Sequence, residues 1–301
     1  MYFALIYGNI KWTMYVYTKD GDRIMKILVT GANGYLGSGV VDRLVADGIE
    51  VVATDFSGEA VSVGASFMQA DLFTVEDPYN YFGQPDAVLH MAWRDGFVHA
   101  SENHINDLPK HVKFLKEMLE GGVKKIAVMG SMHEIGFFEG CITEHTPCWP
   151  QSNYGIAKDA LRNACTLMAK QKGATLQWLR GYYIVGNTER GCSIFSKITA
   201  AAKEGKETFP FTMGQNQFDF IDYDRFCEQV AAAVEQDEID GIINICSGRP
   251  ERLCDRVERF ISENGYDIRL AYGEFPDRPY DSKAVWGSSD KITQILEKRN
   301  R

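Results

Sequence analysis

The sequence predicts an α/β protein whose core is a doubly wound parallel sheet, followed by a smaller C-terminal lobe. Near-continuous apolar stretches predict strands at residues 26–30, 50–54, 87–91, 125–129 and 175–179. Such stretches are typical of parallel strands that are covered on both faces. Apolar residues at helical spacing lie between several of these strands, at 36–45, 112–119 and 156–168. Strands that alternate with helices build βαβ units, and successive units give a doubly wound sheet.

The chain divides into three predicted segments. Residues 1–24 contain two aromatic, β-prone runs and a turn-like sequence at 19–22. They form either an added hairpin or an N-terminal extension, and we favour the extension because Met25 opens a natural first strand. Residues 25–181 form the main domain. After residue 181 the alternation loosens, so residues 182–301 are assigned mainly to the smaller lobe, with about 217–246 returning to the main domain.

Composition excludes several classes of protein. The 301 residues are 45% hydrophobic and 24% charged, as in soluble globular proteins. Lys and Arg total 32 against 41 Asp and Glu, which argues against a nucleic-acid partner because phosphate backbones attract clustered cations. No apolar run approaches the roughly 20 residues of a membrane span. The seven scattered cysteines lack C-x-x-C spacing, so we expect buried thiols in a reducing cytoplasm and no metal site.

A glycine-rich turn directly follows the first predicted strand of the main domain. Residues 30–37 read T-G-A-N-G-Y-L-G and lead into the first predicted helix. Glycines at this position let the backbone approach a pyrophosphate, which then lies at the helix N-terminus. The alternative is a tight βα turn without a ligand. The expected dinucleotide contacts in this turn are Gly31, Asn33, Gly34, Tyr35, Leu36 and Gly37.

Acidic residues after the next strands indicate which dinucleotide binds. Asp55 ends the second strand, where a carboxylate accepts hydrogen bonds from a ribose 2′-hydroxyl and repels a 2′-phosphate. This favours NAD over NADP, although Asp55 could also cap a turn. Asp71 and Leu72 lie where such folds meet the adenine ring. The remaining expected cofactor contacts are Met91, Ala92, Lys158 and Tyr182.

Tyr154 and Lys158 are candidates for acid–base chemistry. They lie four residues apart on one predicted helix, so their side chains share a face. A cation near a phenol favours phenolate and lowers its pKa. Ser131 follows the strand 125–129 at the carboxyl edge of the sheet and could position a reacting oxygen. Taken without the glycine-rich turn, the same residues would be a surface tyrosine, a solvated lysine and a turn serine.

Together these motifs resemble the extended short-chain dehydrogenase/reductases, in the NAD-dependent epimerase/dehydratase group that acts on nucleotide sugars. The resemblance runs from Met25 nearly to the C-terminus and includes the segments 143–147, 179–180, 219–224 and 243–248. It implies a Rossmann domain with bound NAD, a catalytic set of Ser131, Tyr154 and Lys158, and a C-terminal substrate lobe. It also implies a homodimer through helices such as residues 152–172.

The departures from the family pattern narrow the expected activity. Met132 and His133 stand where the sugar-nucleotide 4,6-dehydratases carry an Asp-Glu pair, so dehydration is not expected. Phe218 replaces an arginine that grips the substrate diphosphate in many epimerases. The expected substrate contacts are Ser131, His133, Tyr183 and Arg278.

These features predict a nucleotide-sugar epimerase or 4-keto reductase that uses NAD. The motifs do not separate the two activities, and the C-terminal segment favours a deoxysugar 4-reductase. A non-catalytic redox-sensing regulator that binds the dinucleotide is the alternative from another class. His104 and His111, seven residues apart on one helix, are expected on its surface. Trp93 either closes over the cofactor or packs in the core.

Overall fold

The computed structural model describes residues 2–8, 11–17, 25–186, 188–191, 193–276 and 282–300. Its centre is a seven-stranded, all-parallel sheet in the order β13-β9-β7-β6-β3-β4-β5. The strands are β3 (Lys26–Thr30), β4 (Glu50–Asp55), β5 (Ser66–Gln69), β6 (Ala87–His90), β7 (Lys125–Ser131), β9 (Thr175–Gly181) and β13 (Gly241–Ile245). The order reverses between β3 and β6, which confirms the predicted doubly wound α/β fold.

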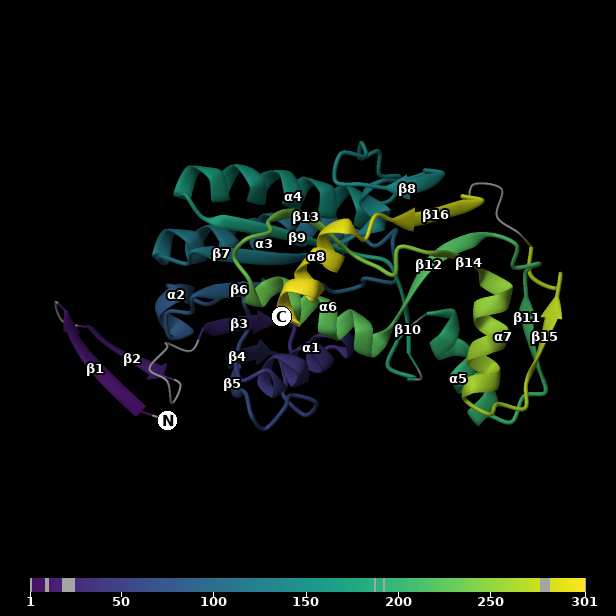
Figure 1. Ribbon diagram of the computed structural model, residues 1–301, viewed down its shortest axis with the longest axis horizontal. Helices are drawn as coiled ribbons and strands as arrows, with labels where there is room; N and C mark the ends of the chain where they lie inside the picture. Colours follow the sequence, from purple (N-terminus) through teal and green to yellow (C-terminus); the bar gives the residue numbers. More distant parts are fainter. Residues whose placement is uncertain are drawn as a thin grey trace.

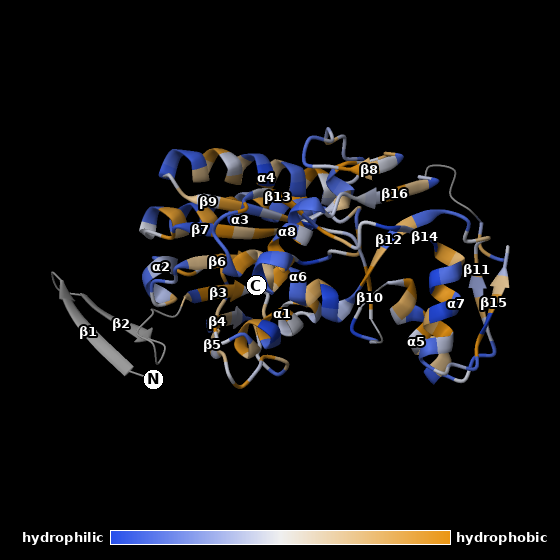
Figure 2. Ribbon diagram, in the orientation of Figure 1, coloured by the Kyte–Doolittle hydropathy of each residue, from blue (hydrophilic) through white to orange (hydrophobic). Residues whose placement is uncertain are grey.

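Helices cover both faces of this sheet (Figure 1). One face packs on α1 (Tyr35–Ala46), α6 (Tyr223–Glu235) and α8 (Asp290–Arg299), and the other on α2 (Pro78–Tyr81), α3 (Asn103–Gly121) and α4 (Asn153–Lys172). Successive strand residues serve opposite layers because side chains alternate along a strand: Ile27 and Val29 join the first core, and Leu28 joins the second. Figure 2 shows the resulting concentration of apolar residues along the central strands.

The smaller lobe has its own sheet and its own core. Its strands are β8 (Gly140–Ile142), β10 (Tyr183–Val185), β12 (Gln217–Asp222), β14 (Pro250–Arg252) and β16 (Ala284–Gly287), with a separate parallel pair of β11 (Thr208–Phe211) and β15 (Arg269–Tyr272). The helices α5 (Ile194–Lys203) and α7 (Leu253–Glu263) complete it. Phe195, Phe218, Phe220 and Phe260 contribute aromatic rings to this core. Of the segment 217–246, β12 lies in this lobe, whereas α6 and β13 join the large domain.

The N-terminal segment contains two paired strands. β1 (Tyr2–Gly8) and β2 (Lys11–Tyr17) form an antiparallel hairpin in which Tyr2 pairs with Tyr17 and Gly8 with Lys11. In Figure 1 the hairpin extends away from the large sheet. The turn expected at residues 19–22 lies outside the described residues.

The cysteines are free thiols wherever the structure describes them. Cys165, Cys227, Cys246 and Cys254 are buried, as predicted, whereas Cys148 is half-buried and Cys141, on the edge strand β8, is exposed. Cys192 falls outside the described residues. Within the described part of the chain, no helix is both long and apolar enough to cross a bilayer.

Candidate active site

The glycine-rich turn places its backbone directly against the end of β6. Gly31 has φ +68°, and a Cβ atom on it would lie 2.7 Å from the amide nitrogen of Ala92 and 2.9 Å from the carbonyl carbon of Met91. A Cβ on Gly37 would lie 2.0 Å from the Gly31 oxygen. Only glycine tolerates these contacts, so the turn is held in a conformation that larger residues would disrupt.

The N-terminus of α1 is open to an anion. Gly34 is its N-cap, no side chain caps it, and its first turn has no carboxylate. Its unpaired N–H groups and the helix dipole therefore favour a phosphate group at this end. The close approach of the glycines and the open helix end together meet the requirements of a dinucleotide pyrophosphate.

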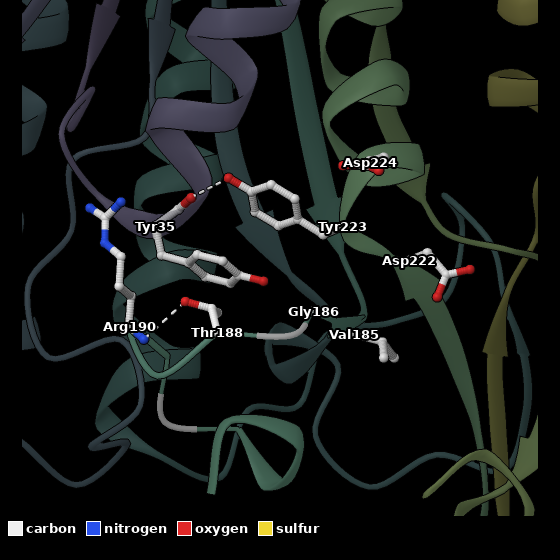
Figure 3. A pocket seen from close by; sticks show the side chains of 8 residues that line it. All are labelled: Tyr35, Val185, Gly186, Thr188, Arg190, Asp222, Tyr223 and Asp224. Atoms are coloured by element: carbon white, nitrogen blue, oxygen red, sulfur yellow. Dashed lines mark hydrogen bonds between the residues drawn. The ribbon is translucent and has the colours of Figure 1, made fainter. Parts of the chain in front are cut away.

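A pocket of about 430 Å³ adjoins this turn (Figure 3). The ring of Tyr35 stacks on that of Tyr223, with 4.7 Å between centroids. The Tyr223 hydroxyl also donates a 2.6 Å hydrogen bond to the backbone oxygen of Tyr35. Arg190, on the loop after β10, donates a hydrogen bond from its guanidinium group to the backbone oxygen of Asn33 at 2.6 Å. The pocket is lined by Tyr35, Val185, Gly186, Thr188, Arg190, Asp222, Tyr223 and Asp224.

Asp55 lies beside the glycine-rich turn and accepts a hydrogen bond from its backbone. Its Oδ2 accepts the Asn33 N–H at 3.0 Å and its Oδ1 accepts the Phe56 N–H at 2.8 Å. Each oxygen can accept further hydrogen bonds, so a ribose hydroxyl could share the carboxylate. The chain then runs back beside Asp55, whose backbone oxygen accepts the Ala70 N–H at 3.1 Å. Asp71 follows and starts a turn by accepting the Phe73 N–H.

Ser131, Tyr154 and Lys158 converge at the carboxyl end of β7. Ser131 is the last residue of the strand, and the other two lie on the first turns of α4. The Ser131 side chain lies close enough to the Tyr154 phenol to lower its pKa. Lys158 Nζ lies 5.9 Å from the Tyr154 ring centroid and donates to the Met129 oxygen at 2.8 Å. The three residues are therefore neighbours.

Burial shifts the pKa values of Tyr154 and Lys158 against the charged form of each side chain. Burial raises the pKa of Tyr154 to about 12, although the nearby Ser131 side chain lowers it. Burial also lowers the pKa of Lys158 from 10.5 to about 7. The expectation of an acidified phenol is therefore wrong for the chain alone, because desolvation disfavours the charged form of both groups.

Glu134 is a buried anchor beneath Ser131. Its Oε1 accepts the Ser131 N–H at 2.6 Å, and its carboxylate accepts the Trp178 indole N–H at 2.9 and 3.0 Å. Arg180 Nη2 lies 3.5 Å from Oε2, and the side chains of both residues are fully buried. A Cβ on Gly130 would lie 2.2 Å from the indole nitrogen, so that glycine makes room for the pair. This carboxylate serves the fold.

Met132 and His133 offer no acid to the site. Met132 packs in the aromatic core. Burial lowers the pKa of His133 to about 4, so its imidazole is neutral at pH 7. Its ring lies edge-on to Tyr154 at 6.1 Å and to Tyr183 at 6.3 Å. His133 therefore contacts both Tyr154 and Tyr183, and the substrate contacts of His133 and Tyr183 stay a prediction.

Two further expected cofactor contacts pack against apolar neighbours, and their contact with a dinucleotide stays a prediction. Tyr182 packs into the smaller lobe against Gly287 and Cys246, and its hydroxyl has no hydrogen-bond partner among the described residues. Leu72 packs against the core beneath α3 and α4. Arg278 lies outside the described residues.

The prediction that His104 and His111 form an exposed helix face is wrong, because they are only 1% and 2% exposed. The loop after β6 folds back over α3 and lays Trp93 against both rings, at 6.0 and 4.5 Å. Trp93 Nε1 donates to His104 Nδ1 at 3.0 Å, and His104 Nε2 lies 3.0 Å from the Val98 oxygen. His104 Nδ1 therefore accepts the indole N–H, and its Nε2 faces the Val98 oxygen.

His90 and His111 form a second set of hydrogen bonds, which links α3 to the glycine-rich turn. Thr30 Oγ1 accepts the Met91 and Ala92 N–H groups, so it donates its own proton to His90 Nδ1 at 2.9 Å. His90 Nε2 then donates to His111 Nδ1, also at 2.9 Å. Burial lowers the pKa of His90 and His111, which keeps both neutral. No three His, Cys, Asp or Glu side chains in the described ranges are grouped as metal ligands.

His99 is a site residue that the sequence did not indicate. Its ring stacks on Tyr154 with centroids 5.0 Å apart and planes 8° apart, and its backbone oxygen accepts the Tyr154 N–H at 3.1 Å. It also contacts His133, at 4.3 Å. It belongs to no motif, and its only signal is its position in the loop after β6.

Comparisons with known proteins identify the family of the chain. The family model described as "NAD dependent epimerase/dehydratase family" matches residues 27–246. A dTDP-6-deoxy-L-talose 4-dehydrogenase (NAD(+)) from Aggregatibacter actinomycetemcomitans is 42% identical over 270 residues, covering 88% of this chain and 100% of that protein.

Solved structures share the fold. UDP-N-acetylglucosamine 4-epimerase from Methanobrevibacter ruminantium M1 superposes with a TM-score of 0.78 at 20% identity, covering 90% of this chain and 92% of that one. UDP-glucuronic acid 4-epimerase from Bacillus cereus, in complex with UDP-glucuronic acid and NAD, gives 0.76 at 21% identity, covering 91% and 93%. The matches confirm the predicted fold and NAD-linked enzyme class, and the chain belongs to the NAD-dependent epimerase/dehydratase family.

Proposed function

We propose that the protein is an NAD-dependent dehydrogenase that oxidises C4 of a dTDP-linked 6-deoxyhexose, and that in reverse it reduces the 4-ketone. The observation that carries this proposal is the convergence of Ser131, Tyr154 and Lys158 at the carboxyl end of β7. The substrate class comes from the relative that is 42% identical and spans 88% of the chain.

NAD would be held by the glycine-rich turn and its neighbours. The open N-terminus of α1 suits the diphosphate, and the free lone pairs of Asp55 suit the adenosine ribose. Lys158 has N–H groups beyond the one that it donates to Met129, and these can bind the hydroxyls of the other ribose.

The chemistry that bound NAD supplies is acceptance of the hydrogen on C4 with its electron pair. Ser131 would hold the C4 oxygen by a hydrogen bond, and Tyr154 would take the hydroxyl proton as the ketone forms. Because burial keeps the phenol protonated at neutral pH, the chain alone is prepared to donate this proton, as ketone reduction requires. In oxidation the phenol must first ionise, which protonated Lys158 favours.

The side chains around Tyr154 also favour this reaction over dehydration. Elimination needs an acid–base pair near the sugar, and the described residues at the equivalent place are the thioether of Met132 and the neutral imidazole of His133. The Glu134 carboxylate is buried and already paired with Arg180. The proposal includes a homodimer, because the exposed Ile156 and Leu167 on α4 are apolar surface that a second copy would cover.

Incubation of the protein with dTDP-6-deoxy-L-talose and NAD⁺ tests the proposal. We expect one NADH for each sugar oxidised, and a fall of about 10²- to 10⁴-fold in kcat for Tyr154→Phe with NAD⁺ binding retained. Tyr81→Phe, at an exposed tyrosine, is the matched control. An epimerase would change the sugar without accumulating NADH, and a regulator would bind NAD⁺ without turnover; either result contradicts the proposal.

A further inference from the structure

The ammonium group of Lys158 lies on the face of an indole ring. Its Nζ is 3.8 Å from the ring centroid of Trp93, well within the range of a cation–π interaction. Its side chain is almost fully buried, and it donates a hydrogen bond to the Met129 backbone oxygen. Among the ion pairs of the described residues, none includes Lys158, so its charge is compensated mainly by neutral groups.

Trp93 is itself fixed in this orientation. Its indole N–H donates to His104 Nδ1, and His104 is anchored in turn to the Val98 oxygen. The ring also packs parallel to His111, with 14° between the planes. The hydrogen bond of its N–H and the stacking on His111 fix the orientation of the indole ring. Its electron-rich face is therefore directed at Lys158.

We propose that Trp93 is a positioning residue for Lys158: its indole face holds the ammonium group beside Tyr154 and stabilises its charge in the absence of a carboxylate partner. A carboxylate would accept hydrogen bonds from Lys158 strongly, whereas an aromatic face stabilises the charge and, beside the bond to Met129, leaves an N–H group for a ligand. This inference rests on the proposed function for its catalytic meaning, but the contact itself does not depend on the substrate.

Burial and the surrounding groups define what Trp93 must offset. Desolvation lowers the pKa of Lys158 to about 7, where half of the chains would carry the ammonium. The ionisable groups that face it are Tyr154 and Cys165 on α4, Glu134 on the turn after β7, His90 on β6 and His111 on α3. The histidines are neutral, so only Glu134 adds a favourable charge. Weakening the indole face should therefore lower this pKa further.

Fluorinated tryptophan tests this without changing the shape of the ring. The full chain is labelled with ¹³C at lysine Cε, all five tryptophans are replaced by analogues with one to four ring fluorines, and the Lys158 signal is titrated by NMR. The signal is assigned by its loss in Lys158→Met. We expect the pKa to fall stepwise with fluorination, by up to about 1 in total, because fluorine withdraws charge from the ring face.

The matched control is the same series in a Trp93→Phe background, where the fluorines lie only on the other four tryptophans. There the pKa of Lys158 should start lower and stay constant. An unchanged pKa in the first series, or an equal fall in both, would overturn the role of Trp93. Because the titration uses no sugar, that failure would leave the proposed function standing, and Tyr154→Phe tests it separately.

Discussion

Glu134 and Lys158 are both buried near the end of β7, and the protein compensates their charges in opposite ways. The Glu134 carboxylate accepts hydrogen bonds from the Ser131 backbone and the Trp178 indole and pairs with Arg180. Lys158 has one backbone oxygen and the face of Trp93. The first charge has hydrogen-bond donors and a cationic partner, although burial still raises the pKa of Glu134, and the second has no carboxylate in contact with it.

The difference indicates which charge serves the fold and which serves the ligand. A carboxylate with these partners cannot take part in chemistry without breaking its network, and breaking a buried pair is costly. A partly compensated ammonium keeps N–H groups for an incoming partner, and the cost appears as a lowered pKa. Strongly shifted pKa values in a cleft are typical of functional sites.

The largest expected effect is that of Lys158→Met on turnover. We expect kcat to fall about 10²- to 10⁴-fold, because the phenol loses its cation. The free energy of unfolding should stay constant or rise, since an apolar side chain replaces a poorly compensated charge. Steady-state kinetics and urea unfolding measure the two quantities. Lys170→Met, at an exposed position of the same helix, should leave both unchanged; a strongly destabilised Lys158→Met would contradict the comparison.

Glu134→Ala should have the opposite profile. It leaves Arg180 buried without its partner, so we expect the free energy of unfolding to fall by about 3–5 kcal/mol. Glu134→Gln keeps the shape and one acceptor, so it should lose less. Thermal and urea unfolding provide the measurement, with the exposed Glu274→Ala as control. If Glu134→Gln folded stably but lost turnover as completely as Tyr154→Phe, Glu134 would belong to the chemistry.

The pH dependence of stability sharpens the same contrast. Between pH 7 and 10.5 the folded chain has released the Lys158 proton while the unfolded chain still binds it. The free energy of unfolding of the wild type therefore gains with rising pH in this window, and Lys158→Met lacks this gain. The stability advantage of the variant should be greatest below pH 7, on the order of a few kcal/mol, and should vanish toward pH 10. An advantage independent of pH would show that Lys158 is not desolvated.

Asp55 is an intermediate case with the smallest expected effect. Two backbone N–H groups satisfy part of its carboxylate and the rest is open. Asp55→Ser should weaken NAD⁺ binding about tenfold to a hundredfold, the worth of a hydrogen bond to a charged group, and should weaken NADP⁺ binding less. Calorimetry with both dinucleotides measures this, with Asp42→Ser on the exposed face of α1 as control. Equal losses for both would assign Asp55 to the turn alone.

Motifs made of neighbouring residues could be predicted from the sequence. The turn 30–37 places its three glycines within one βα connection, so local backbone requirements reveal it. Tyr154 and Lys158 share a helix face by their spacing alone. Trp93, His99 and Glu134 could not be assigned, because their roles depend on partners from other elements. His104 and His111 were misplaced for the same reason: helical spacing does not tell which face a distant loop will cover.

The sequence by itself determined the doubly wound sheet and the glycine-rich turn, because these follow from apolar periodicity and from short-range backbone geometry. Its motifs carried the resemblance to the family. The tertiary structure alone decided the electrostatics of the site. It buried Tyr154 and Lys158, so that desolvation moved both pKa values away from the directions that a solvated pair would show. It also gave Lys158 an indole face in place of a carboxylate, because the loop after β6 folds back between α3 and α4. Charge depends on surroundings, and those surroundings come from residues far apart in the chain.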